Sequence, residues 1–396
     1  MSVPGNRATG RTGARPRLLI VGPLPPPIGG VETFTQAILE SDAFGAFEVA
    51  HCDTTKGRPK STQGRFDAGN FMWAAIHGAR LTRSLARFHP DVVYLPVAGT
   101  WSGVLRDLAL GWLAHRSGAR VIGHQHAGDI HDVLKRVGLD EWIVRAGFAR
   151  FHRLLVLGER WRAMFREYGI AIPCEVCPST FRREVAERGA GSHRAPSPEG
   201  PLRVLYVGQI GRRKGVHDLL RSLRRLNDEG VPVSCTLVGP AQLTGETEAA
   251  HALALELGLD RLARFTGPLV GEALYREYDH ADVLALPSHN EGIPVVLYEA
   301  GAFGVPVVTT PVGAIADLIR SGENGLLVPP GDVGALTAAL RGLAVDAAER
   351  ARLGARLRSD IAAFHPDRIA ARVADAVRAE LAARDTAAAG GHTGAA

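Results

Sequence analysis

The sequence has no long apolar run and few cysteines. None of its 396 residues belongs to an uninterrupted apolar stretch of about eighteen residues, the length that would suggest a membrane-spanning helix. Residues 1–16 are basic, but no apolar segment follows them, so we do not interpret them as a secretory signal. We expect them and the low-complexity residues 385–396 to be disordered. Four cysteines are too few for a disulfide framework in a chain of this length, which favours the reducing cytoplasm.

The common signatures of metal and cofactor sites are missing as well. The chain contains no G-x-G-x-x-G fingerprint after a strand and no D-x-D pair that would hold a metal with a diphosphate. His124, His126 and His131 lack a third-ligand set at standard spacing. Cys174 and Cys177 form one C-x-x-C without a second pair, so two incidental thiols are favoured over a zinc or redox site. We therefore expect neither a metal nor a bound cofactor.

Positive charge is concentrated in the first half of the chain. Residues 1–195 hold 26 Lys and Arg against 17 Asp and Glu, whereas the remainder holds 20 against 24. This asymmetry suggests an anionic partner such as a phosphate compound or an acidic membrane surface. No recognised nucleic-acid-binding motif accompanies the charge, so we expect no nucleic-acid partner. The residues that suggest a membrane surface are arginines around two tryptophans, namely Arg145, Arg150, Arg153, Arg160, Arg162 and Arg166 near Trp142 and Trp161. A solvated basic face is the alternative.

The length and the alternation of apolar runs predict two α/β domains. We predict strands at residues 18–22, 47–53, 91–95, 120–123 and 154–157, and again at 203–208, 234–239, 264–267, 283–287 and 307–310. Helical segments separate them, as in doubly wound parallel sheets. The first domain would span residues 17–190 and the second 200–365, and the composition of residues 179–201 is typical of a linker. Final helices are predicted at 333–343 and 366–384.

Two glycine-containing loops each join a predicted strand to a helix. Gly29 and Gly30 follow the first strand, where glycines let a backbone approach a phosphate closely, although a structural turn would look the same. In the second domain, the residues after the strand at 203–208 read Q-I-G-R-R-K-G. Arg212, Arg213 and Lys214 at a helix N-terminus could neutralise a diphosphate. A solvated basic turn is the alternative.

Two glutamates flank the start of another helix. Glu291 follows the strand at 283–287, and Glu299 lies inside the helix that Pro294 opens. Helix N-termini at the carboxyl ends of parallel strands bind anions, whereas carboxylates accept hydrogen bonds from hydroxyls. A ligand that carries both phosphates and hydroxyls would use both the helix N-terminus and the carboxylates. The alternative is a structural strand–helix unit with surface glutamates.

The unit of a Glu, seven residues and a second Glu, followed by a Gly-Val-Pro turn and an N-G-L-L-V-P-P-G-D hairpin, resembles the signature of retaining glycosyltransferases of family four. That family has the GT-B fold, in which two doubly wound, Rossmann-like domains face a cleft and the last helix crosses back to the first domain. The resemblance implies that Glu299 binds the ribose of a nucleotide-sugar. It also implies that Glu291, with the backbone of Gly292 and Ile293, holds the transferred sugar.

Three further segments resemble parts of the same family. Lys214 matches the lysine of its phosphate clamp, but Gln209 stands where the family usually has arginine, so Arg212 or Arg213 would have to compensate. The loop with Gly29 and Gly30 is similar to the glycine loop that faces the donor sugar and diphosphate. His126, in H-A-G, matches the family's active-site histidine, with His124 as the alternative.

The resemblance implies a metal-independent hexosyltransferase that retains the anomeric configuration. A UDP- or GDP-sugar would be its donor substrate, no separate cofactor would be needed, and the acceptor would be a hydroxyl of unknown identity. Such an enzyme would act in glycan, glycolipid or other glycoconjugate biosynthesis, including that of polysaccharides, in the cytoplasm or peripherally at the inner face of the membrane. A nucleotide-sugar 2-epimerase on the same fold and a non-catalytic scaffold that binds sugar nucleotides are the alternatives.

Overall fold

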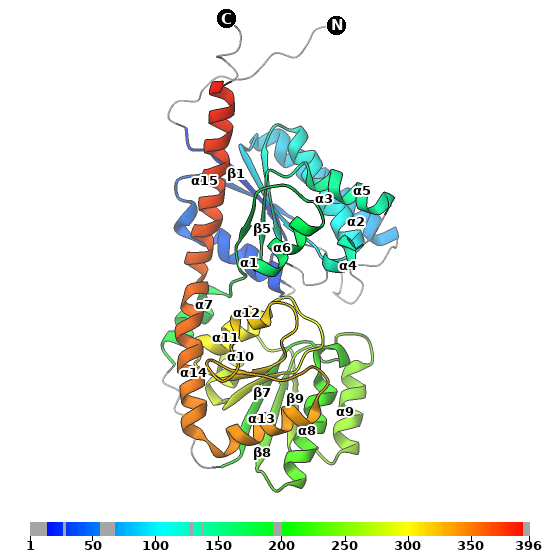
Figure 1. Ribbon diagram of the computed structural model, residues 1–396, viewed down its shortest axis with the longest axis vertical. Helices are drawn as coiled ribbons and strands as arrows, with labels where there is room; N and C mark the ends of the chain where they lie inside the picture. The colour runs from blue at the N-terminus through cyan, green and yellow to red at the C-terminus, as the bar shows by residue number, and fades with distance from the viewer. Residues whose placement is uncertain are drawn as a thin grey trace, which may run out of the picture.

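The computed structural model describes residues 14–26, 29–55, 68–126, 130–135, 138–192 and 200–390. They form two domains stacked along the long axis of the molecule, each built on a parallel sheet of six strands (Figure 1). The predicted fold class is confirmed. No helix within these ranges has the length and apolar character to cross a bilayer.

The first sheet has the strand order β2-β1-β3-β4-β5-β6. Its strands are β1 (Arg17–Gly22), β2 (Glu48–Asp53), β3 (Val92–Val97), β4 (Arg120–Gln125), β5 (Arg153–Val156) and β6 (Cys174–Val176). Because β1 pairs with both β2 and β3, the chain leaves β1 in one direction and later continues in the other. The gap between the carboxyl ends of β1 and β3 is therefore a topological switch point, where open α/β sheets bind ligands.

Helices cover both faces of the first sheet. They are α1 (Gly30–Leu39), α2 (Ala68–Phe88), α3 (Trp101–Arg116), α4 (Ile130–Leu134), α5 (Leu139–Phe148) and α6 (Glu159–Glu167), with a 3-10 turn η1 (Asp42–Phe44). Successive strand residues point to opposite faces. Leu19 and Val21 pack with residues of α2, α3 and α5, whereas Leu18 and Ile20 pack with α1 and the C-terminal helix.

The second sheet has the order β12-β11-β10-β7-β8-β9. Its strands are β7 (Leu202–Val207), β8 (Val233–Val238), β9 (Ala263–Gly267), β10 (Val283–Leu286), β11 (Val307–Thr309) and β12 (Leu326–Leu327). Its switch point lies between β7 and β10. The predicted hairpin at the end of this sheet is wrong, because β12 pairs with β11 in the parallel sense after a connection that contains a short helix.

The second domain has one continuous apolar core around its sheet. Its helices are α8 (Val216–Asp228), α9 (Glu246–Glu256), α10 (Glu272–His280), α11 (Val295–Ala302), α12 (Ile315–Leu318), α13 (Val333–Val345) and α14 (Ala347–Ile361), with 3-10 turns η3 (Arg212–Lys214) and η4 (Ala362–Phe364). All four residues of β10 are buried, as expected for a parallel strand that is covered on both faces.

The segment predicted as a linker contains a helix, α7 (Arg183–Ala190), that belongs to the second domain. Phe181 and Val185 lie in the second core. A Cβ atom added to Gly189 would lie 2.6 Å from the carbonyl oxygen of Ala302, so α7 packs closely on α11. Its remaining surface is largely polar, which explains why composition alone suggested a linker.

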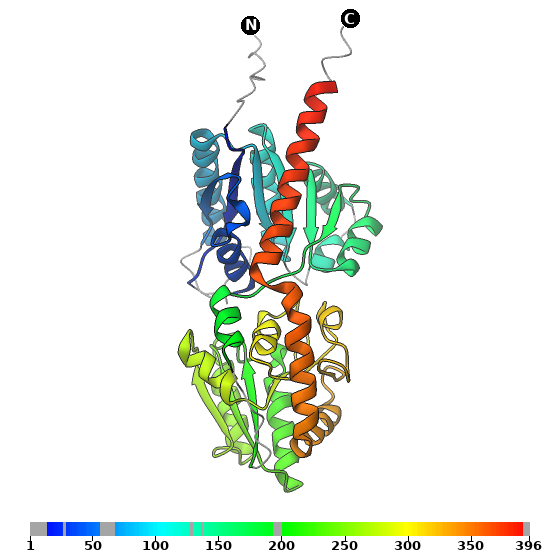
Figure 2. The same cartoon turned by 90° about the vertical axis from the view of Figure 1, so that its left-hand side faces the viewer.

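A long helical arm joins the two domains along one side (Figures 1 and 2). Helix α14 packs on α11 of the second domain, and α15 (Pro366–Gly390) packs on the first sheet through Ile369, Val373 and Val377. The predicted end of this helix at residue 384 is too early. Its alanine-rich final turns favour helix, so the predicted disordered tail is helical as far as Gly390, and residues 391–396 lie outside the described ranges.

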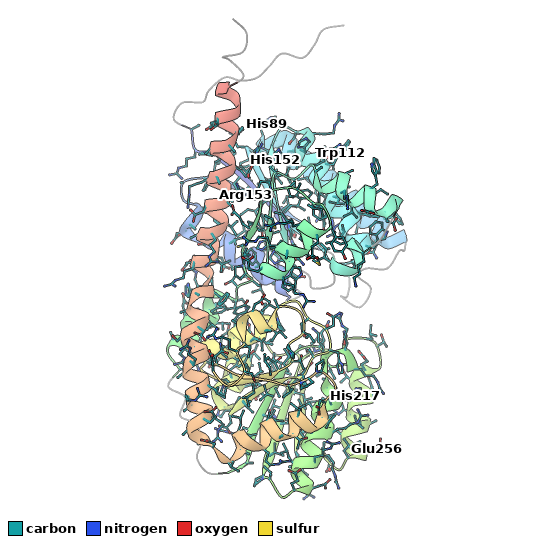
Figure 3. The ribbon with its side chains drawn as sticks, in the orientation of Figure 1. His89, Trp112, His152, Arg153, His217 and Glu256 are labelled. Carbon is teal, nitrogen blue, oxygen red and sulfur yellow. The ribbon has the colours of Figure 1, made fainter. Side chains whose placement is uncertain are left out.

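A buried carboxylate fastens α15 to the first sheet. Glu380 is 1% exposed, and its two oxygens lie 2.9 Å from Nε of Arg120 and 2.8 Å from Nε of Arg153. These arginines stand at the starts of β4 and β5, and Figure 3 shows Arg153 beside α15. Two arginines of the sheet thus neutralise one carboxylate of the helix.

Replacing Glu380 by alanine should lower the free energy of unfolding by about 3 kcal/mol, because Arg120 and Arg153 would lose their buried counter-charge. Urea unfolding followed by circular dichroism measures this loss. The matched control is Glu229→Ala, which removes an exposed pair with Arg341 and should cost about 1 kcal/mol or less. Equal losses in the two variants would contradict the proposed fastening of α15.

Candidate active site

The loops that leave β7 and β10 meet at the switch point of the second sheet. The backbone N–H of His289 donates to the carbonyl of Arg213, with an N···O distance of 2.9 Å. Gly215 has φ +75°, and a Cβ atom there would lie 1.9 Å from the carbonyl oxygen of Pro287. Glycine is therefore required at this contact. The close approach brings the predicted phosphate loop beside the predicted sugar-binding loop.

Lys214 and Glu291, which were predicted separately, form an ion pair. The Lys214 ammonium lies 2.6 and 2.7 Å from the two carboxylate oxygens of Glu291, and the Ser288 hydroxyl donates to one of them at 2.8 Å. Both side chains are largely buried. An ammonium on a flexible stem is a mobile point charge, and carboxylate oxygens accept more than one hydrogen bond each. The pair can therefore serve a phosphate and a hydroxyl at neighbouring positions.

The other two cations of the β7 loop are exposed. Arg212 and Arg213 are exposed in η3, directly before the N-terminus of α8. The buried Tyr206 hydroxyl donates to the carbonyl of Gln209 at 2.6 Å and holds the start of the loop in place. Burial raises the pKa of Tyr206, so this hydroxyl keeps its proton. Two guanidinium groups and a helix N-terminus thus accompany Lys214 on the same loop.

Glu299 lies in α11 and is almost fully buried. The hydroxyl of Tyr278 donates to one of its carboxylate oxygens at 2.9 Å, and the Arg182 guanidinium lies 3.6 Å from the other. Burial raises the pKa of Tyr278 and keeps it a donor. These contacts orient the carboxylate and leave acceptor sites on its oxygens for hydroxyl groups. The sequence did not point to Tyr278 or Arg182, because nothing local distinguishes them from ordinary helix and loop residues.

The first domain presents its glycine loop to the same unit. Gly29 precedes α1 in extended conformation, and a Cβ atom on Gly30 would lie 3.9 Å from Val295 in the first turn of α11. Ile293 packs against the cores of both domains. The carbonyl of Gly292 accepts from the N–H of Ala314 at 3.0 Å, which fixes the loop that carries Glu291. The predicted glycines of the first domain and the glutamate loop of the second therefore lie near one another where the two domains meet.

His126 follows the last residue of β4, at the carboxyl end of the first sheet. Its Nε2 atom lies 3.4 Å from the hydroxyl of Tyr94, and Phe34 meets its ring edge-on. His124 is fully buried, with Nε2 2.9 Å from the carbonyl oxygen of Cys177. Burial lowers the pKa of His124 to about 3 and that of His126 well below its usual value. Both rings are therefore neutral at physiological pH, and His126 is the more exposed of the two. Residues 127–129, which follow it, lie outside the described ranges.

The predicted cysteine pair and the predicted arginine surface have different outcomes. Cys174 and Cys177 are free thiols, and burial raises their pKa values to about 11 and about 12, which leaves them unreactive. The expected arginine surface is only partly formed, because Trp142 is exposed whereas Trp161 is buried in the first core and Arg153 is paired with Glu380. Within the described ranges, no three His, Cys, Asp or Glu side chains are grouped so as to hold a metal ion.

Comparison with known proteins finds a family model that matches most of the second domain. Residues 192–360 match the family model described as glycosyl transferases group 1. Glycogen synthase of Mycobacterium tuberculosis is 34% identical over 165 residues, which are 40% of this chain and 38% of that protein. D-inositol 3-phosphate glycosyltransferase of Streptomyces avermitilis is 32% identical over 202 residues, which are 50% of this chain and 44% of that protein. The matched part thus spans less than half the length of these curated relatives.

Solved structures resemble the whole chain. Sucrose-phosphate synthase from Thermosynechococcus elongatus superposes with a TM-score of 0.72 at 20% identity, over 93% of this chain and all of that one. Anabaena Alr3699/HepE in complex with UDP superposes with a TM-score of 0.69 at 17% identity, over 92% of this chain and all of that one. The chain therefore has the two-domain GT-B fold, and its second domain matches the glycosyl transferases group 1.

Proposed function

We propose that this protein is a glycosyltransferase that moves a sugar from a nucleotide-sugar donor to an acceptor hydroxyl in glycan biosynthesis. The observation that carries the proposal is the meeting of Lys214 and Glu291 at the switch point of the second sheet, inside the segment that matches the family model. The HepE structures hold UDP and UDP-glucose, which supports a UDP-sugar as the first donor to test and a GDP-sugar as the second.

In this proposal, each part of the cleft serves one part of the donor. Glu299, oriented by Tyr278, accepts hydrogen bonds from the ribose hydroxyls. Lys214, with the guanidinium groups before α8 and that helix N-terminus, neutralises the diphosphate. Glu291 holds the transferred sugar, with the backbone of Gly292 and Ile293. The nucleotide-sugar is a substrate, and no separate cofactor takes part.

The ion pair has a specific role in the proposed reaction. As the bond to the sugar breaks, negative charge develops on the departing diphosphate, and a positioned ammonium stabilises it. Lys214 would exchange its contact with Glu291 for the diphosphate, and Glu291 would then accept from a sugar hydroxyl. These cations would stabilise the charge on the departing diphosphate, as a metal ion does in metal-dependent enzymes, so we propose metal-independent chemistry.

We propose retention at the anomeric carbon by front-face substitution, in which the departing phosphate helps to deprotonate the acceptor. Neither glutamate is assigned as the nucleophile of a retaining glycosidase, because in this proposal Glu291 accepts from a hydroxyl of the transferred sugar and Glu299, held by Tyr278, accepts from the ribose. His126 and the loop with Gly29 and Gly30 would contact the sugar from the first domain.

The test is a donor screen with purified protein. UDP-, GDP- and ADP-hexoses are compared for thermal stabilisation and for hydrolysis in buffer containing EDTA, and NMR identifies the anomer of any product. We expect stabilisation and slow turnover with a UDP- or GDP-sugar and retention of configuration. Epimerised sugar released with free nucleotide would instead indicate a 2-epimerase, and binding without any turnover would indicate a scaffold.

Replacing Glu299 by alanine should weaken binding of the nucleoside diphosphate tenfold to a hundredfold, roughly 1.5–3 kcal/mol, because two ribose hydroxyls would lose a charged acceptor. Isothermal titration calorimetry measures the affinity. Glu256→Ala is the matched control, since this glutamate is exposed on α9 at the outer side of the second domain (Figure 3). Unchanged affinity in Glu299→Ala would refute the ribose assignment.

Gln209 generates a further prediction, because an amide brings hydrogen bonds but no charge to the diphosphate. We expect Arg212 or Arg213 to supply the missing charge, with Arg212 favoured because it lies farther from the start of α8. Arg212→Ala should reduce kcat about tenfold or more, and adding Gln209→Arg should restore part of it. Steady-state kinetics of the single and double variants decide this. Full activity in both single arginine variants would show that no compensation is needed.

We also propose that the first domain contacts an acidic membrane, through a surface that shares Trp142 with the predicted cluster and takes its arginines from α2. Phe71 and Trp142 are each 66% exposed, and Met72 and Trp112 are exposed as well. They lie on α2, α3 and α5, on the side of the first sheet opposite α15 (Figures 1 and 3). Helix α2 contains three arginines and no acidic residue. Aromatic side chains beside arginines are typical of surfaces that bind anionic lipids.

Co-sedimentation with vesicles tests this surface. The protein should bind vesicles rich in phosphatidylglycerol and not those of phosphatidylcholine, and Phe71→Ser with Trp142→Ser should reduce binding about tenfold. Leu255→Ser is the control, since Leu255 is equally exposed but lies on the second domain. Equal losses in the control and the double variant, or binding independent of lipid charge, would contradict the proposal.

A further inference from the structure

Three polar side chains in the first domain form a row that ends at His126. The row begins at the carbonyl oxygen of Cys177, which lies 2.9 Å from Nε2 of His124. The other ring nitrogen of His124, Nδ1, lies 2.8 Å from the hydroxyl oxygen of Tyr94. The same hydroxyl lies 3.4 Å from Nε2 of His126. The four groups come from β3, β4, the residue after β4 and the residue after β6, so only the folded sheet brings them together.

The chemistry of these groups fixes the direction of every hydrogen bond in the row. A backbone carbonyl only accepts, so Nε2 of His124 carries its proton. Burial keeps the His124 ring neutral, because it lowers the pKa to about 3, and Nδ1 must then be an acceptor. Tyr94 therefore donates its single proton to His124. Its oxygen is left to accept from Nε2–H of His126.

The reverse direction is not consistent with the same contacts. If Tyr94 donated to His126, it would have to accept from Nδ1 of His124. The His124 ring would then either carry protons on both nitrogens, which full burial opposes, or turn a lone pair toward the Cys177 carbonyl. Phe34 packs edge-on against both imidazoles and offers no hydrogen bond. Gln125 lies between the two histidines in sequence, so its side chain points to the opposite face of the sheet.

We propose that Tyr94 and His124 are positioning residues that hold His126 in the Nε2–H tautomer, so that its Nδ1 atom accepts a hydrogen bond from a hydroxyl of the transferred sugar. The choice of ligand rests on the proposed function, whereas the tautomer rests on the hydrogen-bond row alone. His126 then binds the sugar as a neutral acceptor and does not deliver a proton to it. This role distinguishes His126 from the cationic groups of the second domain, which serve the diphosphate.

The tautomer can be measured directly, without any assay of activity. In protein labelled with 15N-histidine, two-bond correlation spectra distinguish a protonated from an unprotonated ring nitrogen. Signals of the two histidines are assigned by their loss in His124→Gln and His126→Gln. We expect both rings to be neutral at pH 7, with protonated Nε2 and unprotonated Nδ1. Observation of His126 as the Nδ1–H tautomer or as imidazolium would overturn the proposal, even if variants of Tyr94 failed to fold.

Tyr94→Phe tests the consequence for the reaction. The ring remains, but the link between the histidines is lost, so the His126 signals should shift toward a mixture of tautomers. Because one oriented hydrogen bond is lost, kcat should fall about fivefold to tenfold while KM for a UDP-sugar stays within about twofold. Tyr298→Phe is the matched control, because Tyr298 is also buried but its hydroxyl has no hydrogen-bond partner among the described residues.

The outcomes separate this inference from the proposed function. Wild-type tautomer and kcat in Tyr94→Phe would overturn the positioning role. A shifted tautomer in Tyr94→Phe, with no sugar transfer by the wild type from any donor, would leave the hydrogen-bond row in place and refute the glycosyltransferase proposal.

Discussion

The candidate site lies where the second parallel sheet changes the direction in which successive strands are added. In the second sheet the connections from β7 and β10 run to opposite sides, so their loops meet above the carboxyl ends of adjacent strands. The contact of Gly215 with the carbonyl of Pro287 closes this gap and leaves room for no Cβ atom. Lys214 and Glu291 are neighbours because of that contact, although 77 residues separate them. The charged pair is thus a consequence of topology and of one glycine.

The position of the first domain over this site depends on a second constraint. Helix α15 returns from the second domain to the first sheet, where Glu380 lies between two arginines of β4 and β5. Ile293 adds a direct contact, since it packs against both cores. With the domains held in this way, the loop with Gly30 faces the first turn of α11. The loop with Gly30 is therefore held against the segment that carries Glu291 and Glu299 by the contacts of α15 and of Ile293.

Much of the fold followed from the sequence, because a strand that is buried on both faces must be apolar along its whole length. β10 and β7 were predicted on that ground, and Glu291 and Glu299 were found because a strand, a loop and a helix start lie within one short segment. The failures involve long-range contacts. Helix α7 was predicted as a linker because only its inner face is apolar. β12 was predicted as part of a hairpin because the sequence of a two-residue strand does not indicate whether it pairs in the parallel or the antiparallel sense. Tyr94 and Tyr278 act through partners 32 and 21 residues away, so no local pattern marks them.

The most direct test of the central claim is the effect of Glu291→Gln on nucleoside diphosphate affinity and on sugar transfer, measured by calorimetry and by a coupled assay. In the proposed reaction, Lys214 is shared between Glu291 and the diphosphate. Removing the carboxylate charge should free the ammonium and strengthen binding of the diphosphate about threefold to tenfold, while transfer falls about a hundredfold or more because the sugar loses its acceptor. Weaker binding of the diphosphate together with undiminished transfer would contradict the account.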